Sequence, residues 1–328
     1  MASTRQPPGT DFHILCGFLG SGKTTLLLDY LAAPEAADTA VLVNDVGQVD
    51  VDGAVVTASA GGTPIALLAN GCVCCSIGSE LAGTIQGLVL DRQERDQPPF
   101  RRMILECSGL SRPGPILRSL ADLGRFDFRV RILATFDAGQ GRDHAAHFEE
   151  AAAQLAAAQT VVLTKLDRPD AAPAEVAAAA ARALNPLATV LAQPDRRARA
   201  LAAFSGPGPG AAALPEPKVV GLRGLRHPRI GVFLAEVPAG LDWDAVAAWI
   251  EDLAALCGDR LLRVKGLVEI AGVDGPVLVQ GVGTIFSPPL RVAPGTGIPG
   301  SVVVIAHDMA LAELAAAAAP HGVAMHDG

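Results

Sequence analysis

The sequence predicts an α/β protein with a doubly wound, mostly parallel sheet, followed by a second, smaller α+β domain. Short β-prone apolar runs alternate with helical patterns from residue 12 to about residue 192. A Pro/Gly/Ala-rich stretch at 205–217 then interrupts both periodicities, and several strands in succession follow it. Alternating strands and helices are typical of a parallel sheet covered on both faces, whereas runs of strands flanked by helices favour an α+β arrangement.

The first domain contains seven strand-like runs separated by helical patterns. We expect strands at 12–16, 40–44, 65–69, 102–106, 129–136, 160–164 and 188–191. We expect helices at 23–31, 79–90, 143–158 and 173–184. The last of these begins with a proline, which the first turn of a helix tolerates.

The second domain has a different order of elements. We expect strands at 229–237, 261–270, 276–286 and 301–307, and helices at 242–256 and 309–319. The whole chain then divides into a disordered N-terminus (1–11), a first domain (12–198), a linker (199–222) and a C-terminal domain (223–328).

Length and composition exclude several classes of protein. A chain of 328 residues fits about two domains. No apolar run reaches the roughly 18 residues that span a bilayer, and no secretory signal is visible, so we expect a cytoplasmic protein with no membrane contact. A net charge of -8 and the lack of a basic stripe argue against a nucleic-acid partner. In a reducing compartment, the six cysteines indicate metal binding or reactivity more than disulfides.

The segment GFLGSGKT at 17–24 fits the pattern G-x-x-x-x-G-K-[ST] and lies between an apolar strand and an apolar helix. In that context the pattern predicts a phosphate-binding loop, in which backbone N–H groups surround phosphate oxygens. Lys23 is expected to reach the β- and γ-phosphates, and the Thr24 hydroxyl to bind Mg²⁺. The nucleotide-binding residues expected in this segment are Gly17, Gly20, Ser21, Gly22, Lys23, Thr24 and Thr25.

Two further motifs follow later strands. In ECSG at 106–109, Glu106 is expected near Mg²⁺ and Gly109 at the γ-phosphate. In TKLD at 164–167, the Asp167 carboxylate can accept protons from guanine N1 and from its exocyclic amino group, while the stem of Lys165 lies against the base. Adenine offers no such pairing, so the order of the motifs favours GTP.

The segment NGCVCC at 70–75 places Cys72, Cys74 and Cys75 within four positions. Three thiolates suit Zn²⁺, Cu(I) or Co²⁺. No second CxxC or His pair lies nearby, which favours an open site completed by a carboxylate, a water or a partner protein. Redox chemistry is a weaker alternative because the spacing is not CxxC, and packing as small buried residues is another. We expect the remaining cysteines, Cys16, Cys107 and Cys257, to pack in the core.

Together these motifs resemble the CobW-type P-loop GTPases, a group that includes cobalamin-biosynthesis CobW proteins, nitrile hydratase activators and zinc metallochaperones. The resemblance covers most of the chain. It rests on GFLGSGKTT, VNDVGQVDVDG, NGCVCC, ECSGLSRP and LTKLD, and on LLRVKG and VLVQGVGTIFSPP in the C-terminal domain. It implies a hydrolase acting on the GTP β–γ phosphoanhydride, whose cycle is coupled to metal loading and transfer, with a CobW-type C-terminal domain.

The resemblance also implies the roles of individual residues. Lys23, Thr24 and Glu106 become the catalytic and Mg²⁺-site residues, and Lys165 and Asp167 become the guanine readers. Cys72, Cys74 and Cys75 then hold a transferable Zn²⁺ or Co²⁺. The implied partner is a client metalloprotein or metal-insertion machinery, and homo-oligomerisation stays open.

The chain departs from the family pattern at three places. Gln48 replaces an acid; if that acid is a metal ligand or helps to order the loop, Asp45 or Asp50 has to carry its role, and Asp45 is assigned to the Mg²⁺ region. Thr164 stands where Asn is usual, which predicts the loss of an amide that braces the phosphate loop. The seven histidines are scattered rather than clustered; for His144 and His147, exposed helix positions are favoured over metal binding.

Two other functions fit part of the pattern. One is a P-loop ATPase or kinase whose cysteine cluster holds a structural zinc. The other is a non-hydrolysing scaffold that activates a metalloenzyme by binding it.

Overall fold

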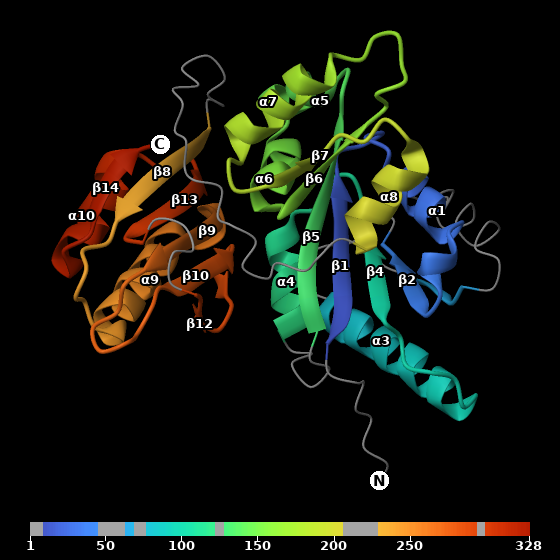
Figure 1. Cartoon of the computed structure of the whole chain (residues 1–328), viewed down its shortest axis with the longest axis horizontal. Helices are drawn as coiled ribbons and strands as arrows, with labels where there is room; N and C mark the ends of the chain where they lie inside the picture. The colour runs from blue at the N-terminus through green and yellow to red at the C-terminus, as the bar shows by residue number, and fades with distance from the viewer. Residues whose placement is uncertain (1–8, 45–62, 69–76, 122–127, 206–228, 294–298) are drawn as a thin grey trace.

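The computed structural model describes residues 9–44, 63–68, 77–121, 128–205, 229–293 and 299–328. In this part of the chain the first domain is built on seven parallel strands in the order β3-β2-β4-β1-β5-β6-β7. The second domain is built on a separate antiparallel sheet, and Figure 1 shows the two sheets side by side. The predicted α/β class with a second, smaller α+β domain is confirmed.

The elements of the first domain alternate along the chain. Its strands are β1 (Thr10–Gly17), β2 (Thr39–Val43), β3 (Ile65–Leu67), β4 (Arg102–Glu106), β5 (Phe128–Asp137), β6 (Thr160–Thr164) and β7 (Thr189–Leu191). Its helices are α1 (Lys23–Leu31), η1 (Pro34–Ala36), α3 (Ile77–Glu94), α4 (Pro113–Ala121), α5 (Gly141–His147), α6 (Glu149–Ala157), α7 (Ala174–Leu184) and α8 (Arg196–Ser205).

Helices cover both faces of this sheet, as the continuously apolar strands require. One face packs against α1 and α8, where the Tyr30 and Phe204 rings lie 4.7 Å apart between centroids. The other face packs against α3, α4, α6 and α7. Because all seven strands are parallel, the carboxyl ends of β1, β4, β5 and β6 meet at one edge of the sheet, where open α/β folds bind ligands.

The second domain follows residue 228. Its strands are β8 (Ile230–Glu236), β9 (Leu261–Val268), β10 (Val277–Val282), β11 (Ile285–Phe286), β12 (Leu290–Arg291), β13 (Ser301–His307) and β14 (Ala324–Asp327). Its helices are α9 (Trp243–Cys257), η3 (Gly258–Arg260), α10 (Leu311–Ala318) and η4 (Ala319–His321).

Two helices fill one face of the second sheet. Trp249 and Leu253 of α9 and Leu314 of α10 are buried against it. On the opposite face, Ile230 and Ile305 pack against alanines of α6, a helix of the first domain. This contact joins the two domains.

Two predicted elements are each divided in the structure. The helix expected at 143–158 breaks at Phe148, whose backbone is extended (φ -119°, ψ 117°) and separates α5 from α6. The Phe148 ring stacks on Phe18 of the phosphate loop, 4.6 Å between centroids, so a tertiary contact accompanies the break. The strand expected at 276–286 is a hairpin of β10 and β11, which turns at Gly283 in the left-handed conformation (φ 57°).

The expected domain boundaries also shift. Thr10 and Asp11 belong to β1 and not to a disordered tail, because they pair with β5. Residues 199–205, expected in the linker, continue α8, which stays helical because Ala200, Ala203 and Phe204 bury its apolar face. The other predicted boundaries remain predictions.

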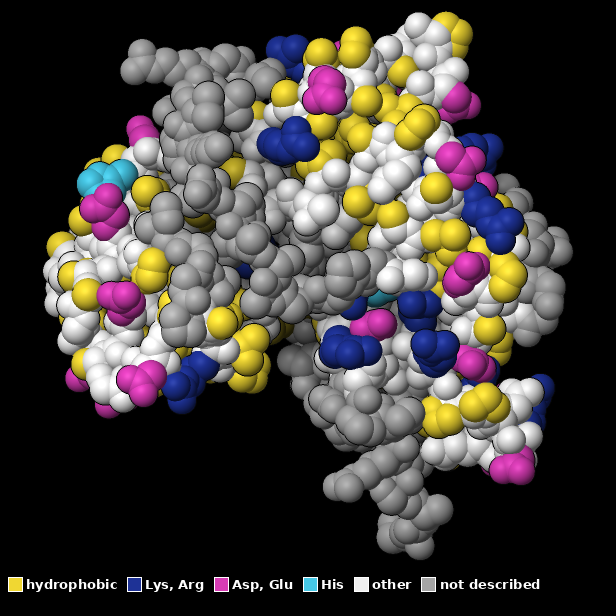
Figure 2. All heavy atoms as spheres, in the orientation of Figure 1, with side chains coloured by type: hydrophobic (Ala, Val, Ile, Leu, Met, Phe, Trp, Pro, Cys, Tyr) yellow, Lys and Arg dark blue, Asp and Glu magenta, His cyan; other side chains and the backbone are white. Residues whose placement is uncertain are grey.

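The surface carries a mixture of charges. On the face drawn in Figure 2, Lys and Arg side chains are interspersed with Asp and Glu side chains. None of the helices in the described ranges has the length and apolarity that a bilayer span requires.

Candidate nucleotide-binding site

The predicted phosphate loop connects β1 to α1 and depends on glycine at several turns. Gly20 and Gly22 adopt left-handed conformations (φ 68° and 95°). At Gly17 a Cβ atom would lie only 2.0 Å from Thr135 Oγ1, so the loop can approach β5 only without a side chain there. The Ser21 hydroxyl lies 2.7 Å from the same Thr135 oxygen, which ties the loop to the sheet.

Lys23 is 8% exposed and lies across the loop. Its Nζ donates a 3.0 Å hydrogen bond to the Gly17 carbonyl and lies 3.4 Å from the Phe18 carbonyl. The ammonium group is thus held inside the loop, close to the backbone that would surround phosphate oxygens.

Thr24, in the first turn of α1, meets Glu106, the last residue of β4. The Thr24 hydroxyl donates a 2.6 Å hydrogen bond to Glu106 Oε1. Glu106 ends β4, where it pairs in register with Leu15 of β1, and it is 3% exposed. A hydroxyl and a carboxylate are hard oxygen donors of the kind Mg²⁺ prefers, so the pair fits the predicted magnesium region.

Gly109 lies directly against the phosphate loop. A Cβ atom at this position would stand 2.7 Å from the Leu19 backbone nitrogen and 2.6 Å from a Leu19 methyl group. Only glycine permits this approach. The loop that follows β4 is therefore packed on the phosphate loop. This position fits the predicted role of Gly109 at the γ-phosphate.

Thr164 braces the phosphate loop although it lacks the amide that Asn would supply. Its hydroxyl donates a 2.7 Å hydrogen bond to the Ser21 carbonyl, and its Cβ lies 3.4 Å from the position of a Cβ built on Gly22. The amide is lost as predicted, but the shorter hydroxyl supplies another brace because it reaches a carbonyl of the loop itself.

Lys165 is held by an aspartate that sequence reasoning missed. Its backbone is left-handed (φ 55°), and its Nζ donates a 2.6 Å hydrogen bond to Asp137 Oδ2. Burial alone would raise the pKa of Asp137, but hydrogen bonds from Lys165 and from the N–H groups of Gly139 and Gln140 lower it. Asp137 is the last residue of β5, which lies between β1 and β6, the strands that lead into the phosphate loop and into TKLD. An acidic residue at the end of an apolar strand was the signal that the sequence offered. Asp167 is exposed.

The predicted transition-metal ligands Cys72, Cys74 and Cys75, together with Asp45 and Gln48, lie outside the described residues. Within the described ranges, no group of three His, Cys, Asp or Glu side chains is arranged to hold a metal ion.

The three remaining cysteines are buried in the cores, as predicted. A hydrogen bond with the Cys16 thiol, followed by burial, raises the pKa of Cys107. Burial raises the pKa of Cys257 to about 11. The raised pKa values favour the neutral thiol at Cys107 and Cys257.

The two helical histidines differ in their surroundings. His147 is exposed, as expected, and a ring nitrogen lies 2.8 Å from the Asp143 carbonyl oxygen. The expectation is wrong for His144, which is partly buried because its ring packs on Phe18, 5.0 Å between centroids.

Two family descriptions match the chain in succession. Residues 11–192 match "CobW/HypB/UreG, nucleotide-binding domain". Residues 230–319 match "Cobalamin synthesis protein cobW C-terminal domain".

Individual relatives match over most of their length. The chain is 31% identical over 284 residues to the zinc chaperone YjiA of Escherichia coli strain K12, covering 84% of this chain and 86% of YjiA. It is 30% identical over 322 residues to the zinc chaperone CobW of Pseudomonas aeruginosa, covering 83% and 80%. The crystal structure of Zn(II)-bound YjiA GTPase has the same fold, with a TM-score of 0.66 at 22% identity over 95% of this chain and 98% of YjiA. These matches show that the protein belongs to the CobW family of P-loop GTPases.

Proposed function

We propose that this protein is a GTP-hydrolysing zinc chaperone that delivers its metal to a client metalloprotein. The observation that carries the nucleotide part is the 2.6 Å hydrogen bond between Thr24 and Glu106. It brings the phosphate loop and the acidic motif together at the edge of the sheet where a nucleotide would bind. The names of the relatives, which are zinc chaperones, support zinc over cobalt as the cargo.

The residues of the phosphate loop have distinct roles in this proposal. Lys23 stabilises the negative charge that develops on the phosphate oxygens during hydrolysis. Thr24 and Glu106 hold the magnesium region, with Asp45 assigned to it from the sequence alone. Mg²⁺, when bound, neutralises charge on the β- and γ-phosphates. Gly109 lets the loop after β4 approach the γ-phosphate through its backbone.

Guanine specificity is assigned to the segment after β6. Asp167 accepts the two guanine protons, and Lys165 lies against the base. The ion pair with Asp137 restricts the long Lys165 side chain before nucleotide binding, which lowers the entropy lost on binding.

The cargo site is assigned to Cys72, Cys74 and Cys75. Three thiolates leave one position of a tetrahedral zinc site for another ligand. An incomplete ligand set suits a metal that has to leave. A coupling free energy of roughly a few kcal/mol between nucleotide binding and zinc binding would change the zinc affinity about a hundredfold.

A hydrolysis assay on the full chain tests the nucleotide part. We expect GTP to be hydrolysed in preference to ATP, and Lys23→Ala to slow hydrolysis by about 10²-fold or more because it removes a charge from the transition state. Glu106→Gln should also slow hydrolysis. Its matched control is Glu175→Gln, the same substitution at an exposed position on α7.

Three outcomes would contradict the proposal. Equal use of ATP, with unfolding on zinc chelation, would indicate an ATPase or kinase with a structural zinc. If the chain does not hydrolyse GTP and the Lys23→Ala variant still retains a client protein, the chain would be an activator scaffold. Unchanged hydrolysis in Lys23→Ala would remove the phosphate loop from the reaction.

A further inference from the structure

The loop that carries Gly109 is fastened to helix α6. Gln154 of this helix is fully buried, and its Nε2 donates hydrogen bonds of 3.0 Å to the Gly109 carbonyl and 2.8 Å to the Ser111 carbonyl. Because Gly109 itself packs on Leu19, a displacement of this loop at the phosphate loop would strain or move α6.

A different side of α6 faces the C-terminal domain. Glu149, Ala152 and Ala156 recur at spacings of three and four residues, which places them along one face of the helix. Gln154 lies about 140° around the helix from Glu149, at the usual 100° per residue. The same rigid helix thus presents one face to the nucleotide-site loop and another to the second domain.

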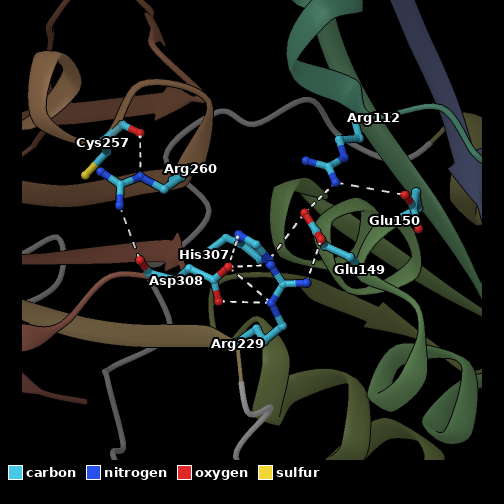
Figure 3. A network of polar contacts seen from close by, with 8 residues as sticks. All are labelled: Arg112, Glu149, Glu150, Arg229, Cys257, Arg260, His307 and Asp308. Carbon is cyan, nitrogen blue, oxygen red and sulfur yellow. Dashed lines mark hydrogen bonds and ion pairs between the residues drawn. The ribbon is translucent and has the colours of Figure 1, made fainter.

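Glu149 receives positively charged groups from both domains (Figure 3). Arg112, at the end of the loop that carries Gly109, donates to Glu149 Oε1. Arg229, next to β8 in the C-terminal domain, donates a 2.8 Å hydrogen bond to Glu149 Oε2. His307 Nε2 lies 3.3 Å from Oε1, a contact that becomes an ion pair when the imidazole is protonated.

Arg229 is in turn fixed within its own domain. Its guanidinium donates to both carboxylate oxygens of Asp308, with Nε at 3.0 and 3.1 Å, and Figure 3 shows Asp308 beside His307 at the end of β13. Beside this polar cluster, Ala152 and Ala156 pack on Ile230, Val303 and Ile305. Exposed ion pairs individually stabilise little, but here they share one carboxylate beside an apolar contact.

We propose that α6 couples the nucleotide state to the docking of the C-terminal domain, with Gln154 and Glu149 as positioning residues. In this mechanism a γ-phosphate contact at Gly109 shifts the loop that Gln154 and Arg112 hold. Glu149 then changes its contacts with Arg229 and His307. The inference rests on the proposed function, because it requires that GTP and GDP be bound with different loop positions. Coupling is reciprocal, so a client bound to the C-terminal domain would alter nucleotide affinity through the same helix.

The test measures, on the full chain, the affinities for GDP and for a non-hydrolysable GTP analogue. We expect Arg229→Gln and Glu149→Gln to change the ratio of these affinities by about fivefold or more, the lower range of typical allosteric coupling. Arg118→Gln is the matched control. Arg118 of α4 also crosses between the domains, with Nη1 2.9 Å from Asp259 Oδ1, but both side chains are exposed and the pair does not involve α6.

A double substitution separates coupling from simple stabilisation. Arg112→Gln and Arg229→Gln should have non-additive effects on the affinity ratio, because both guanidinium groups reach one carboxylate. Thermal melting checks that each variant is folded; the side chains of Arg112 and Arg229 are 44% and 50% exposed, so their replacement leaves the cores intact.

The possible results separate this inference from the proposed function. If the wild-type chain binds neither nucleotide, the proposed function fails and the inference with it. If the wild type binds both, the inference alone is overturned by any of three results: equal affinities for the two nucleotides, a ratio in Arg229→Gln and Glu149→Gln that matches the wild type, or an equal change in Arg118→Gln.

Discussion

The Thr164 hydroxyl donates a 2.7 Å hydrogen bond to the Ser21 carbonyl and so joins the segment proposed to read guanine to the proposed phosphate loop. The two residues are 143 positions apart in the sequence. Both are buried, so the carbonyl has no access to solvent as a replacement partner. The two proposed binding segments are therefore held together at the carboxyl ends of the strands.

Replacing Thr164 by Val tests this connection, because valine keeps the shape and removes the donor. We expect the free energy of unfolding to fall by about 1–3 kcal/mol, the usual penalty for an unsatisfied buried group. GTP and GDP should both bind more weakly, since the brace joins two segments that both nucleotides are proposed to contact. Urea unfolding and calorimetry measure the two effects. Thr160→Val, at the start of the same strand, is the control, and an equal effect there would contradict the role of the hydroxyl.

The Asp137–Lys165 pair predicts a dependence of stability on pH. The pKa of Asp137 is lowered in the folded state, so its contribution is present above the unfolded-state pKa and is lost as the pH falls through the folded value. We expect Asp137→Asn to be less stable than the wild type at neutral pH, and this difference to narrow below about pH 4. Guanine affinity should also fall, because Lys165 loses its anchor.

Unfolding curves at several pH values check the sign of this dependence. The exposed Asp170→Asn is the control. A gap between Asp137→Asn and wild type that widens on acidification would contradict the lowered pKa.

Alanine substitutions at two glycines should have opposite effects, because Gly109 contacts Leu19 and Gly83 has open space around it. In Gly109→Ala the new methyl group would meet the Leu19 backbone, so we expect lower thermal stability and slower GTP hydrolysis. In Gly83→Ala the methyl group meets nothing within 4 Å on helix α3, and the helix should gain about 0.5–1 kcal/mol. If Gly109→Ala hydrolyses GTP at the wild-type rate, the close approach is not required.

Local patterns predicted the phosphate loop and the strand-helix alternation because both depend on neighbouring residues. The strand that ends in Glu106 and the strand that ends in Thr164 were located by their apolar runs, and the parallel sheet then places both ends on the same side of the sheet. In contrast, the Thr164 brace and the Asp137–Lys165 pair are contacts between distant segments, which no local pattern encodes.

Elements that depend on tertiary packing were also missed. Helix α8 is rich in arginine, and its helical state depends on burying Phe204 against α1. Strand β14 is four residues long and exists by pairing with β8. The break at Phe148 accompanies a stacking contact with Phe18 that a helical periodicity cannot reveal.

Asn185 predicts a stability effect at the end of α6. Its fully buried Nδ2 lies within 2.8–2.9 Å of the carbonyl oxygens of Leu155, Ala156 and Ala158. Carbonyls at the end of a helix have no donor four residues further on; of these three, the Leu155 oxygen also accepts a 3.2 Å hydrogen bond from the Ala158 N–H. We expect Asn185→Leu, which keeps the branched shape and removes the amide, to lower the free energy of unfolding by about 1–3 kcal/mol. Urea unfolding measures it, and wild-type stability in this variant would show that the amide is dispensable.

The zinc affinity of the full chain in two nucleotide states tests the central claim most directly. We predict that affinities measured with GDP and with a non-hydrolysable GTP analogue differ about a hundredfold in the wild type and become equal in Lys23→Ala. A triple variant, Cys72→Ser with Cys74→Ser and Cys75→Ser, should bind zinc weakly in both states. Equal zinc affinity with the two nucleotides in the wild-type chain would contradict a GTP-driven zinc chaperone.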